Sequence, residues 1–265
     1  MKHIITIIDK EWAEVFKNRI VLFTMILIPL IFIILPLVML YLTGQGMGDM
    51  GGLDTADVPT GFLSQCDPEM TGGECMQIYL ITEFLLLFMM MPIIIPITIA
   101  AYSVVGEKTT RSLEPLLATP ITTFELLAGK SLAAAIPAII VGWVSFGVFL
   151  IALPLTGTSS AVIRFIAGPT WLLAIFVAGP LMAIASVNFA LYISSRVNDP
   201  RTAEQVAALL LLPLLGLLFA QLAGIIVINV MTMLNFIGGM ILVDIAMIYI
   251  GVSIFQRENI LTRWK

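Results

Sequence analysis

The sequence predicts an all-α integral membrane protein with six transmembrane helices. Hydrophobic residues make up 60% of the chain and charged residues 11%, and the mean hydropathy is +1.07, values far from those of soluble proteins. Six apolar runs are each long enough to cross about 30 Å of hydrocarbon, which takes about 20 residues of helix. One membrane domain therefore fills residues 1–265. The predicted spans are residues 20–42, 84–105, 132–155, 171–193, 206–228 and 234–255.

The Lys and Arg residues predict the orientation of these spans. If the N-terminus is cytoplasmic, 12 of the 13 basic residues fall in cytoplasmic segments, and only Arg164 lies outside. A bias of this kind marks the cytoplasmic face, by the positive-inside rule. We therefore expect a multi-pass protein of the cytoplasmic membrane with both termini in the cytoplasm. The cytoplasmic basic residues are Lys2, Lys10, Lys17, Arg19, Lys108, Arg111, Lys130, Arg196, Arg201, Arg257, Arg263 and Lys265.

The segment before the first span, residues 1–19, has the pattern of an amphipathic helix. Its apolar side chains share one helical face, and charged side chains occupy much of the rest. We expect an elbow helix that lies in the membrane interface, with Trp12 at headgroup depth. The apolar face holds Ile4, Ile5, Ile8, Trp12, Val15 and Phe16, and the polar side holds Asp9, Glu11, Glu14 and Lys17.

Residues 43–83 form an acidic segment outside the cytoplasm that contains both cysteines. No basic residue occurs in it, and the segment is either a solvated loop or one that attracts a cation. Cys66 and Cys75 either form a disulfide, which persists outside the cytoplasm, or remain two free thiols. We do not expect a metal site built on these two cysteines, which lacks the partners typical of zinc sites. Six acids precede Glu83 in this segment: Asp49, Asp54, Asp57, Asp67, Glu69 and Glu74.

The cytoplasmic segment between the second and third spans, residues 106–130, is too long for a simple turn. Thr110–Ala118 can form a short helix, which Pro120 ends. Thr122 and Glu125 then have the spacing of a capping box, which predicts the start of a helix that continues into the third span. The short helix either is moved by a cytosolic partner or packs on the lipid headgroups.

Few polar side chains lie within the predicted spans, which makes them candidates for a transport pathway. Asp244 lies near the middle of the sixth span, where an exposed charge costs about 2.5–3.5 kcal/mol or more. It contacts a substrate or ion, or makes a structural hydrogen bond to a neighbouring helix. Glu83, at the outer edge of the second span, either lines the mouth of a transport pathway or is a solvated carboxylate at the membrane interface. Asn188 and Gln221 either line a path or join helices by hydrogen bonds.

Other functional classes lack the residues that they need. Gly129-Lys130-Ser131 matches the end of a Walker A phosphate loop, but Phe124 stands where the first glycine is required. The sequence also has no metal motif and no paired intramembrane carboxylates, so we expect neither an enzyme nor a cofactor held by this chain. The alternative function is a stand-alone secondary transporter or channel that uses Asp244, although such proteins usually contain inverted repeats.

Several short stretches form a further pattern. They are Lys10-Glu11-Trp12, Glu107-Lys108, the run SLEPLLATP at 112–120, the run ELLAGK at 125–130, and the ending at 255–265. Together with the six spans, they resemble the type-2 ABC-transporter permeases, the family of drug, polysaccharide and ion exporter subunits. The resemblance covers essentially the whole chain.

The resemblance implies a type V ABC exporter fold and an ATP-driven exporter of which this chain is the membrane subunit. It implies a separate ATPase subunit that holds ATP and Mg, and a second permease, either an identical copy or a paralogue. It also implies short re-entrant helices between the fifth and sixth spans, for which residues 224–235 are the candidate.

In such permeases the segment after the second span carries a coupling helix that docks on the ATPase. By this resemblance, charged residues here pair with the ATPase or with the N-terminal helix. The implicated residues are Glu107, Lys108, Arg111, Leu113, Glu114, Pro115, Leu116, Leu117, Pro120 and Glu125.

Overall fold

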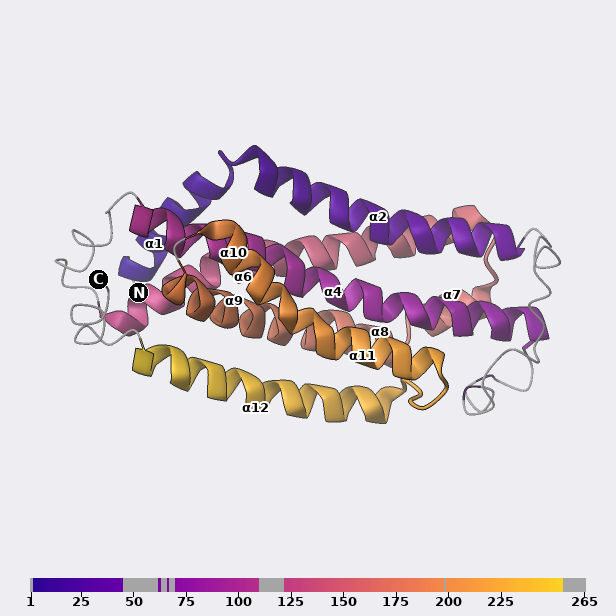
Figure 1. The fold of residues 1–265 in the computed structure, drawn as a ribbon. Helices are drawn as coiled ribbons and strands as arrows, with labels where there is room; N and C mark the ends of the chain where they lie inside the picture. Colours follow the sequence, from indigo (N-terminus) through magenta and orange to yellow (C-terminus); the bar gives the residue numbers. More distant parts are fainter. Residues whose placement is uncertain are drawn as a thin grey trace.

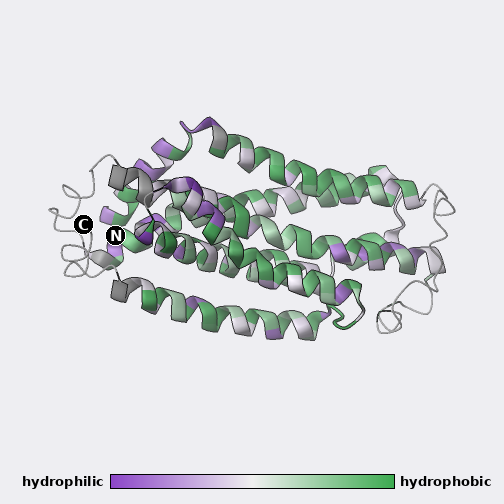
Figure 2. Cartoon of the chain, viewed as in Figure 1, coloured by the Kyte–Doolittle hydropathy of each residue, from purple (hydrophilic) through white to green (hydrophobic). Residues whose placement is uncertain are grey.

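A computed structural model of the chain describes residues 2–44, 62, 66, 70–109, 122–197 and 199–254. In this part of the chain the secondary structure is helical throughout, and the long helices lie side by side in one elongated bundle (Figure 1). Hydrophobic residues cover most of the length of these helices (Figure 2). The prediction of an all-α membrane protein is therefore confirmed.

Six helical segments are long and apolar enough to cross a membrane, as the sequence predicts. They are Val21–Gly44, Gly72–Ala101, Phe124–Thr156, Ser160–Arg196, Pro200–Leu222 and Val230–Gly251. The first span is α2 (Arg19–Gly44), the second α4 (Gly72–Thr109), and the third α6 (Thr123–Ala152) with η3 (Leu153–Thr156). The fourth span consists of α7 (Ser160–Ile166), α8 (Pro169–Leu173), η4 (Ala174–Ala178) and α9 (Gly179–Arg196). The fifth consists of α10 (Pro200–Ala207), η5 (Ala208–Leu210) and α11 (Leu211–Leu222), and the sixth is α12 (Val230–Ile254).

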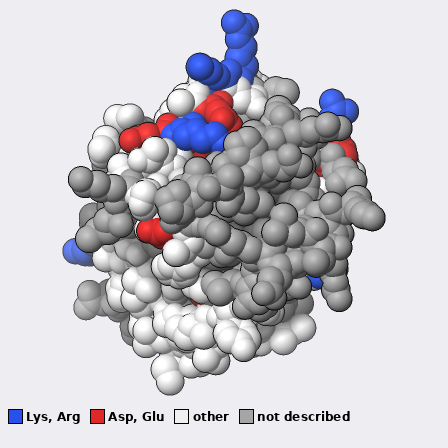
Figure 3. All heavy atoms as spheres, turned by 90° about the vertical axis from the view of Figure 1, so that its left-hand side faces the viewer, with Lys and Arg blue, Asp and Glu red and all other residues white. Residues whose placement is uncertain are grey.

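The two ends of the bundle differ in charge. We call one of them the basic end, because Lys10, Arg19, Arg196 and Arg201 lie on helices that begin or finish there, and Lys17 lies in the turn between α1 and α2. Figure 3 views this end and shows its basic side chains beside acidic ones. The opposite end carries Arg164 at the last turn of α7, and it carries both cysteines. We call it the disulfide end.

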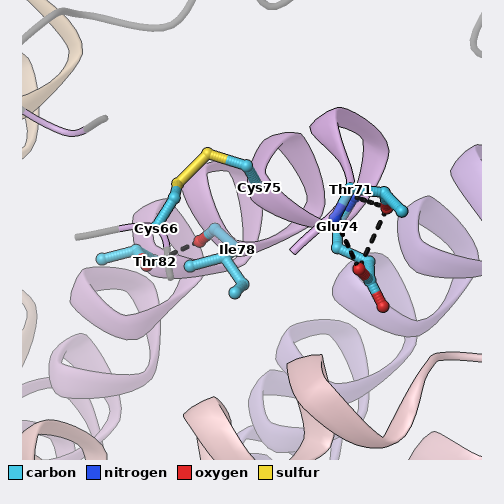
Figure 4. Close-up of a disulfide and its surroundings, with 6 residues drawn as sticks. All are labelled: Cys66, Thr71, Glu74, Cys75, Ile78 and Thr82. Atoms are coloured by element: carbon cyan, nitrogen blue, oxygen red, sulfur yellow. Dashed lines mark hydrogen bonds between the residues drawn. A yellow bond between two sulfur atoms is a disulfide. The ribbon is translucent and has the colours of Figure 1, made fainter. Parts of the chain in front are cut away.

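The structure corrects the predicted start of the second span. We expected an irregular segment up to residue 83, but α4 begins at Gly72. Thr71 and Glu74 close a hydrogen-bonded turn at this point, in which the Thr71 amide and hydroxyl donate to Glu74 Oε2 at 2.8 and 3.0 Å. A disulfide joins Cys66 to Cys75 in the first turn of α4 (Figure 4). These local bonds stabilise the first turns of α4, which precede the apolar part of the second span.

α4 is the central helix of the bundle, and it packs against α2, α6, α9, α10 and α11. Pro96 removes the amide that would pair with the Pro92 carbonyl one turn earlier. The Ser186 hydroxyl on α9 donates to this Pro92 oxygen at 3.3 Å. A neighbouring helix thus satisfies the backbone group that the proline frees, as hydrocarbon requires.

The fourth span is a composite of short helices around an aromatic cluster. Trp171 in α8 is fully buried and packs against Phe88, Phe146 and Phe149, with ring centroids 5.9–6.1 Å apart. A π-helical turn, η4, follows, and its Ile175 carbonyl accepts a hydrogen bond from the Trp143 indole at 3.2 Å. The cluster fixes α4, α6 and the fourth span against one another.

The segment between the fifth and sixth spans differs from the implied re-entrant helices. α11 ends at Leu222, and Gly224 turns the chain with a φ of +69°. α12 already begins at Val230, where the Asn229 side chain caps it by accepting the Thr232 amide at 2.9 Å. Residues 223–229 form a turn and irregular chain, and they are too few for a pair of membrane-inserted helices.

α1 (Lys2–Val15) crosses the basic end obliquely and packs against the start of α6 (Figure 1). The Trp12 indole donates to the Ala133 carbonyl at 3.0 Å, so this ring binds protein where we expected a headgroup anchor. Gly129 allows the close approach, because a Cβ there would lie 2.9 Å from Ile7 Cβ. The helix was predicted, but its contact with α6 was not.

This contact predicts the effect of adding one methyl group. Gly129→Ala should lower the free energy of unfolding by roughly 1–3 kcal/mol, because the new Cβ overpacks the α1–α6 contact. Thermal unfolding in detergent micelles measures the difference. Gly147→Ala is the matched control, since a Cβ at this position of α6 meets open space and should be neutral or stabilising. Equal stability of the two variants would contradict the packing of α1 on α6.

Candidate functional site

The segment that the sequence singles out as a coupling element lies between two helix ends at the basic end. α4 ends at Thr109 and α6 begins at Thr123. Glu107 and Lys108 belong to the last turns of α4. Glu125 belongs to the first turn of α6, where it completes the predicted capping box with Thr122. The remaining candidates, Arg111, Leu113, Glu114, Pro115, Leu116, Leu117 and Pro120, lie outside the described residues.

A buried ion pair stands beside these two helix ends. Lys130 Nζ on α6 lies 2.8 Å from Glu11 Oε1 on α1, and each side chain is only 4% exposed. Lys130 Nζ also donates to Ser103 Oγ on α4 at 2.8 Å. One ammonium group thus joins α1, α4 and α6, and we call these three residues the Lys130 junction.

Glu11 is ionised in this environment. Burial raises the pKa of its carboxyl, but the charge of Lys130 and the hydrogen bonds from Lys130 and Ser103 more than offset burial and lower the pKa below 4.5. Glu11 therefore carries a negative charge at neutral pH. Removing one partner of such a pair leaves an uncompensated buried charge, which costs about 3–5 kcal/mol.

α1 does not contact the bundle equally on all sides. A cavity of about 210 Å³ lies on its other side, between α1, the start of α2 and the end of α4. Glu11, Asn18 and Ser103 line it. α1 is therefore packed firmly against α6 and more loosely against α2 and α4.

The Lys130 junction also explains the phosphate-loop-like tripeptide. Lys130 lies within α6, and its ammonium faces Glu11 rather than an open loop. A Walker A lysine follows a strand and a glycine-rich turn whose amides hold phosphate. The geometry of a nucleotide site is thus not met here.

Sequence reasoning missed Glu11 as a buried residue. We expected it on the polar side of an interfacial helix, but it is 3% exposed. The helical neighbours of Glu11 gave a signal, because Ile7 lies four residues before it and Val15 four residues after it, and both are buried. An acid in the middle of an apolar stripe indicates a buried partner.

Two of the candidate pathway residues meet in the half of the bundle near the disulfide end. Glu83 on α4 faces Gln221 on α11. Both Glu83 carboxylate oxygens are enclosed by the chain, so the expectation of a solvated carboxylate is wrong. Among the described residues, neither these oxygens nor the Gln221 amide has a hydrogen bond of standard geometry. Gln221 is 3% exposed.

The other two candidates lie elsewhere. Asn188 accepts a hydrogen bond from Ser131 at 3.0 Å and donates to the Ile184 carbonyl at 3.0 Å, so it joins α9 to α6. Asp244 is 6% exposed within α12, and no described residue forms a hydrogen bond with its carboxylate. The structure brings Glu83 and Gln221 together but does not bring all four residues to one site.

An apolar cavity of about 60 Å³ lies next to the Glu83–Gln221 pair. Leu86, one helical turn after Glu83, and Leu217, one turn before Gln221, both line it. Thr232 and Phe236 of α12 close it from the other side. Within the described ranges no group of His, Cys, Asp or Glu is arranged to hold a metal ion.

Comparison with known families agrees with this architecture. The family described as ABC-2 family transporter protein matches residues 5–262, from α1 to beyond α12. No curated protein matches the chain. A match over nearly the full chain, on a six-span helical bundle, assigns the fold and the general role together. The chain belongs to the ABC-2 family of transporters, as a membrane permease subunit.

Proposed function

We propose that this permease is one half of an ATP-driven exporter in which two six-span subunits enclose one pathway, each resting on a separate ATPase subunit. The membership of the ABC-2 family carries this proposal, since such permeases contain no nucleotide-binding domain and work with ABC ATPases. The second permease is an identical copy or a paralogue. ATP and Mg bind to the partner ATPase.

The basic end faces the cytoplasm in this proposal. The distribution of Lys and Arg supports that orientation by the positive-inside rule. The Cys66–Cys75 disulfide supports it independently, because the disulfide lies at the opposite end and such bonds persist outside the cytoplasm. Because the number of spans is even, both termini lie on the cytoplasmic side of the cell membrane in this proposal.

The coupling step is assigned to residues 107–125. Because α4 and α6 flank residues 110–121, a displacement of this segment acts directly on the second and third spans. When the two ATPases close on ATP, they move this segment, and the spans change access to the pathway. The charged residues on which docking depends are Glu107, Lys108, Arg111, Glu114 and Glu125, with Leu113, Pro115, Leu116, Leu117 and Pro120 shaping the contact surface.

The Glu83–Gln221 pair is assigned to the pathway. An enclosed carboxylate beside an amide, both without standard hydrogen bonds, is costly unless water or a transported molecule reaches it in another state. Asp244 is a second intramembrane acid and remains a candidate contact. Asn188 is assigned to packing, because both ends of its amide are bonded.

Co-purification tests the proposed function as a whole. When the full chain is solubilised gently from its native membrane and captured, an ATPase subunit should accompany it in equal amount. Its turnover should be inhibited by vanadate. A chain that purifies alone under these conditions would favour the stand-alone transporter or channel that uses Asp244.

The pathway assignment predicts accessibility at Gln221. In the purified complex, Gln221→Cys should react with a membrane-impermeant thiol reagent, and its rate should differ about tenfold between the nucleotide-free and vanadate-trapped states. Both natural cysteines are joined in the disulfide and do not compete. Ser186→Cys is the control, because Ser186 is fully buried between α9 and α4 and should react in neither state. An inserted Gln221→Cys variant that stays unreactive in both states contradicts the assignment.

The coupling assignment predicts uncoupling by Arg111→Ala with Glu114→Ala. This double variant should insert normally and hydrolyse ATP, but the labelling of Gln221→Cys should no longer depend on nucleotide. Coupling free energies of about 1–3 kcal/mol correspond to a 5–150-fold loss. The control is Lys10→Ala with Glu14→Ala, which removes an exposed pair at the same end of the bundle. Nucleotide-dependent labelling as in the unmodified permease would show that Arg111 and Glu114 do not dock.

A further inference from the structure

The Lys130 junction joins three helices that are far apart in the sequence. Glu11 precedes Lys130 by 119 residues, and Ser103 precedes it by 27. α4 and α6 are the helices on either side of residues 110–121, whereas α1 is connected to neither of them by a short loop. Together with the Trp12–Ala133 hydrogen bond, the ion pair is thus a polar contact through which α1 meets the ends of the second and third spans.

α1 is in turn continuous with the first span through a tight, hydrogen-bonded turn. The Phe16 amide donates to Trp12 at 2.9 Å, the Asn18 amide to Val15 at 3.0 Å, and the Leu22 amide to Asn18 at 3.1 Å. The turn therefore connects α1 to α2 without a flexible linker. A displacement of α1 therefore reaches the start of α2.

A buried ion pair is an inefficient way to gain stability alone. The desolvation of both charges offsets most of their attraction, so apolar side chains of similar size stabilise as well or better. The pair determines the position of α1 along α6 instead, because the Lys130 ammonium donates to Glu11 of α1 and to Ser103 of α4, each at 2.8 Å. The 210 Å³ cavity beside α1 means that few other contacts hold it toward α4.

We propose that Glu11 and Lys130 are positioning residues that make α1 move together with the ends of α4 and α6, so that a displacement of residues 110–121 also reaches the first span. This inference rests on the proposed function, because it assumes that a partner ATPase moves that segment. It adds α1 and α2 to the moving part, and it assigns a role to two charged residues that the coupling segment does not contain.

Distances between spin labels test this proposal without a known substrate. The labels are placed on exposed positions of α1, α6 and α9 by Ala13→Cys, Phe124→Cys and Arg196→Cys, in pairs, with labelled subunits diluted by unlabelled ones. They are measured in the co-purified complex, nucleotide-free and vanadate-trapped. We expect the α1–α6 distance to stay constant while the α1–α9 and α6–α9 distances change together.

Variants at the junction then test the ion pair itself. In Glu11→Gln the α6–α9 distance should still change with nucleotide, but the α1–α9 distance should no longer follow it. The reversed pair Glu11→Lys with Lys130→Glu should restore the joint movement, whereas Lys10→Ala with Glu14→Ala should leave it unaltered. A merely structural role would lower the amount of assembled complex and leave the joint movement intact in what assembles.

Three outcomes would overturn the proposal. They are a nucleotide-dependent α1–α6 distance in the unmodified permease, an α6–α9 distance that never changes, and α1 following α6 in Glu11→Gln as before. If Glu11→Gln does not assemble, the spin-label distances in the unmodified permease and in the reversed pair still test the proposal. Co-purification of the ATPase is measured first, so a failure of the proposed function is seen separately from a failure of this inference.

Discussion

The ammonium group of Lys130 is the charge around which the basic end of the bundle is assembled. A lysine at the start of a transmembrane helix, without contact to water, requires anionic or polar partners from within the protein. Glu11 supplies the charge and Ser103 a further acceptor. These partners come from different parts of the chain, so satisfying one charge fixes the relative position of three helices. Gly129, next to Lys130, lets α1 come close enough for the pair to form.

The same constraint acts on the backbone in the middle of the bundle. Pro92 and Pro96 interrupt the hydrogen-bond ladder of α4, and hydrocarbon provides no replacement donor. Ser186 of α9 donates to the freed Pro92 carbonyl. α4 is enclosed by other helices along most of its apolar length, whereas α2, which contains Pro29 and Pro36, is far less enclosed by the described part of the chain. At Pro92, a neighbouring helix thus supplies the donor that the proline removes.

The parts of this structure that were predictable from the sequence are those with a local physical cause. Hydropathy predicts the six spans, and the spacing of Thr122 and Glu125 predicts where α6 begins. The same spacing occurs at Thr71 and Glu74, where a reading based on apolar runs overlooks it and places the start of α4 too late. The Glu11–Lys130 pair was not predictable in this way, because its partners are 119 residues apart. Only the position of Glu11 within an apolar stripe indicated that it has a buried partner.

α4 connects the Lys130 junction physically with the candidate pathway. Ser103 and Glu83 lie on this helix 20 residues apart, a separation of about 30 Å along its axis at 1.5 Å per residue. Pro92 and Pro96 stand between them, where the ladder is interrupted and the helix bends most easily. A displacement of the end of α4 at the basic end of the bundle therefore need not move the helix as a rigid rod. Phe88, on the Glu83 side of the prolines, is held by the aromatic cluster around Trp171, so a bend at Pro92 and Pro96 changes the angle between the Ser103 end of α4 and the part of α4 that carries Glu83.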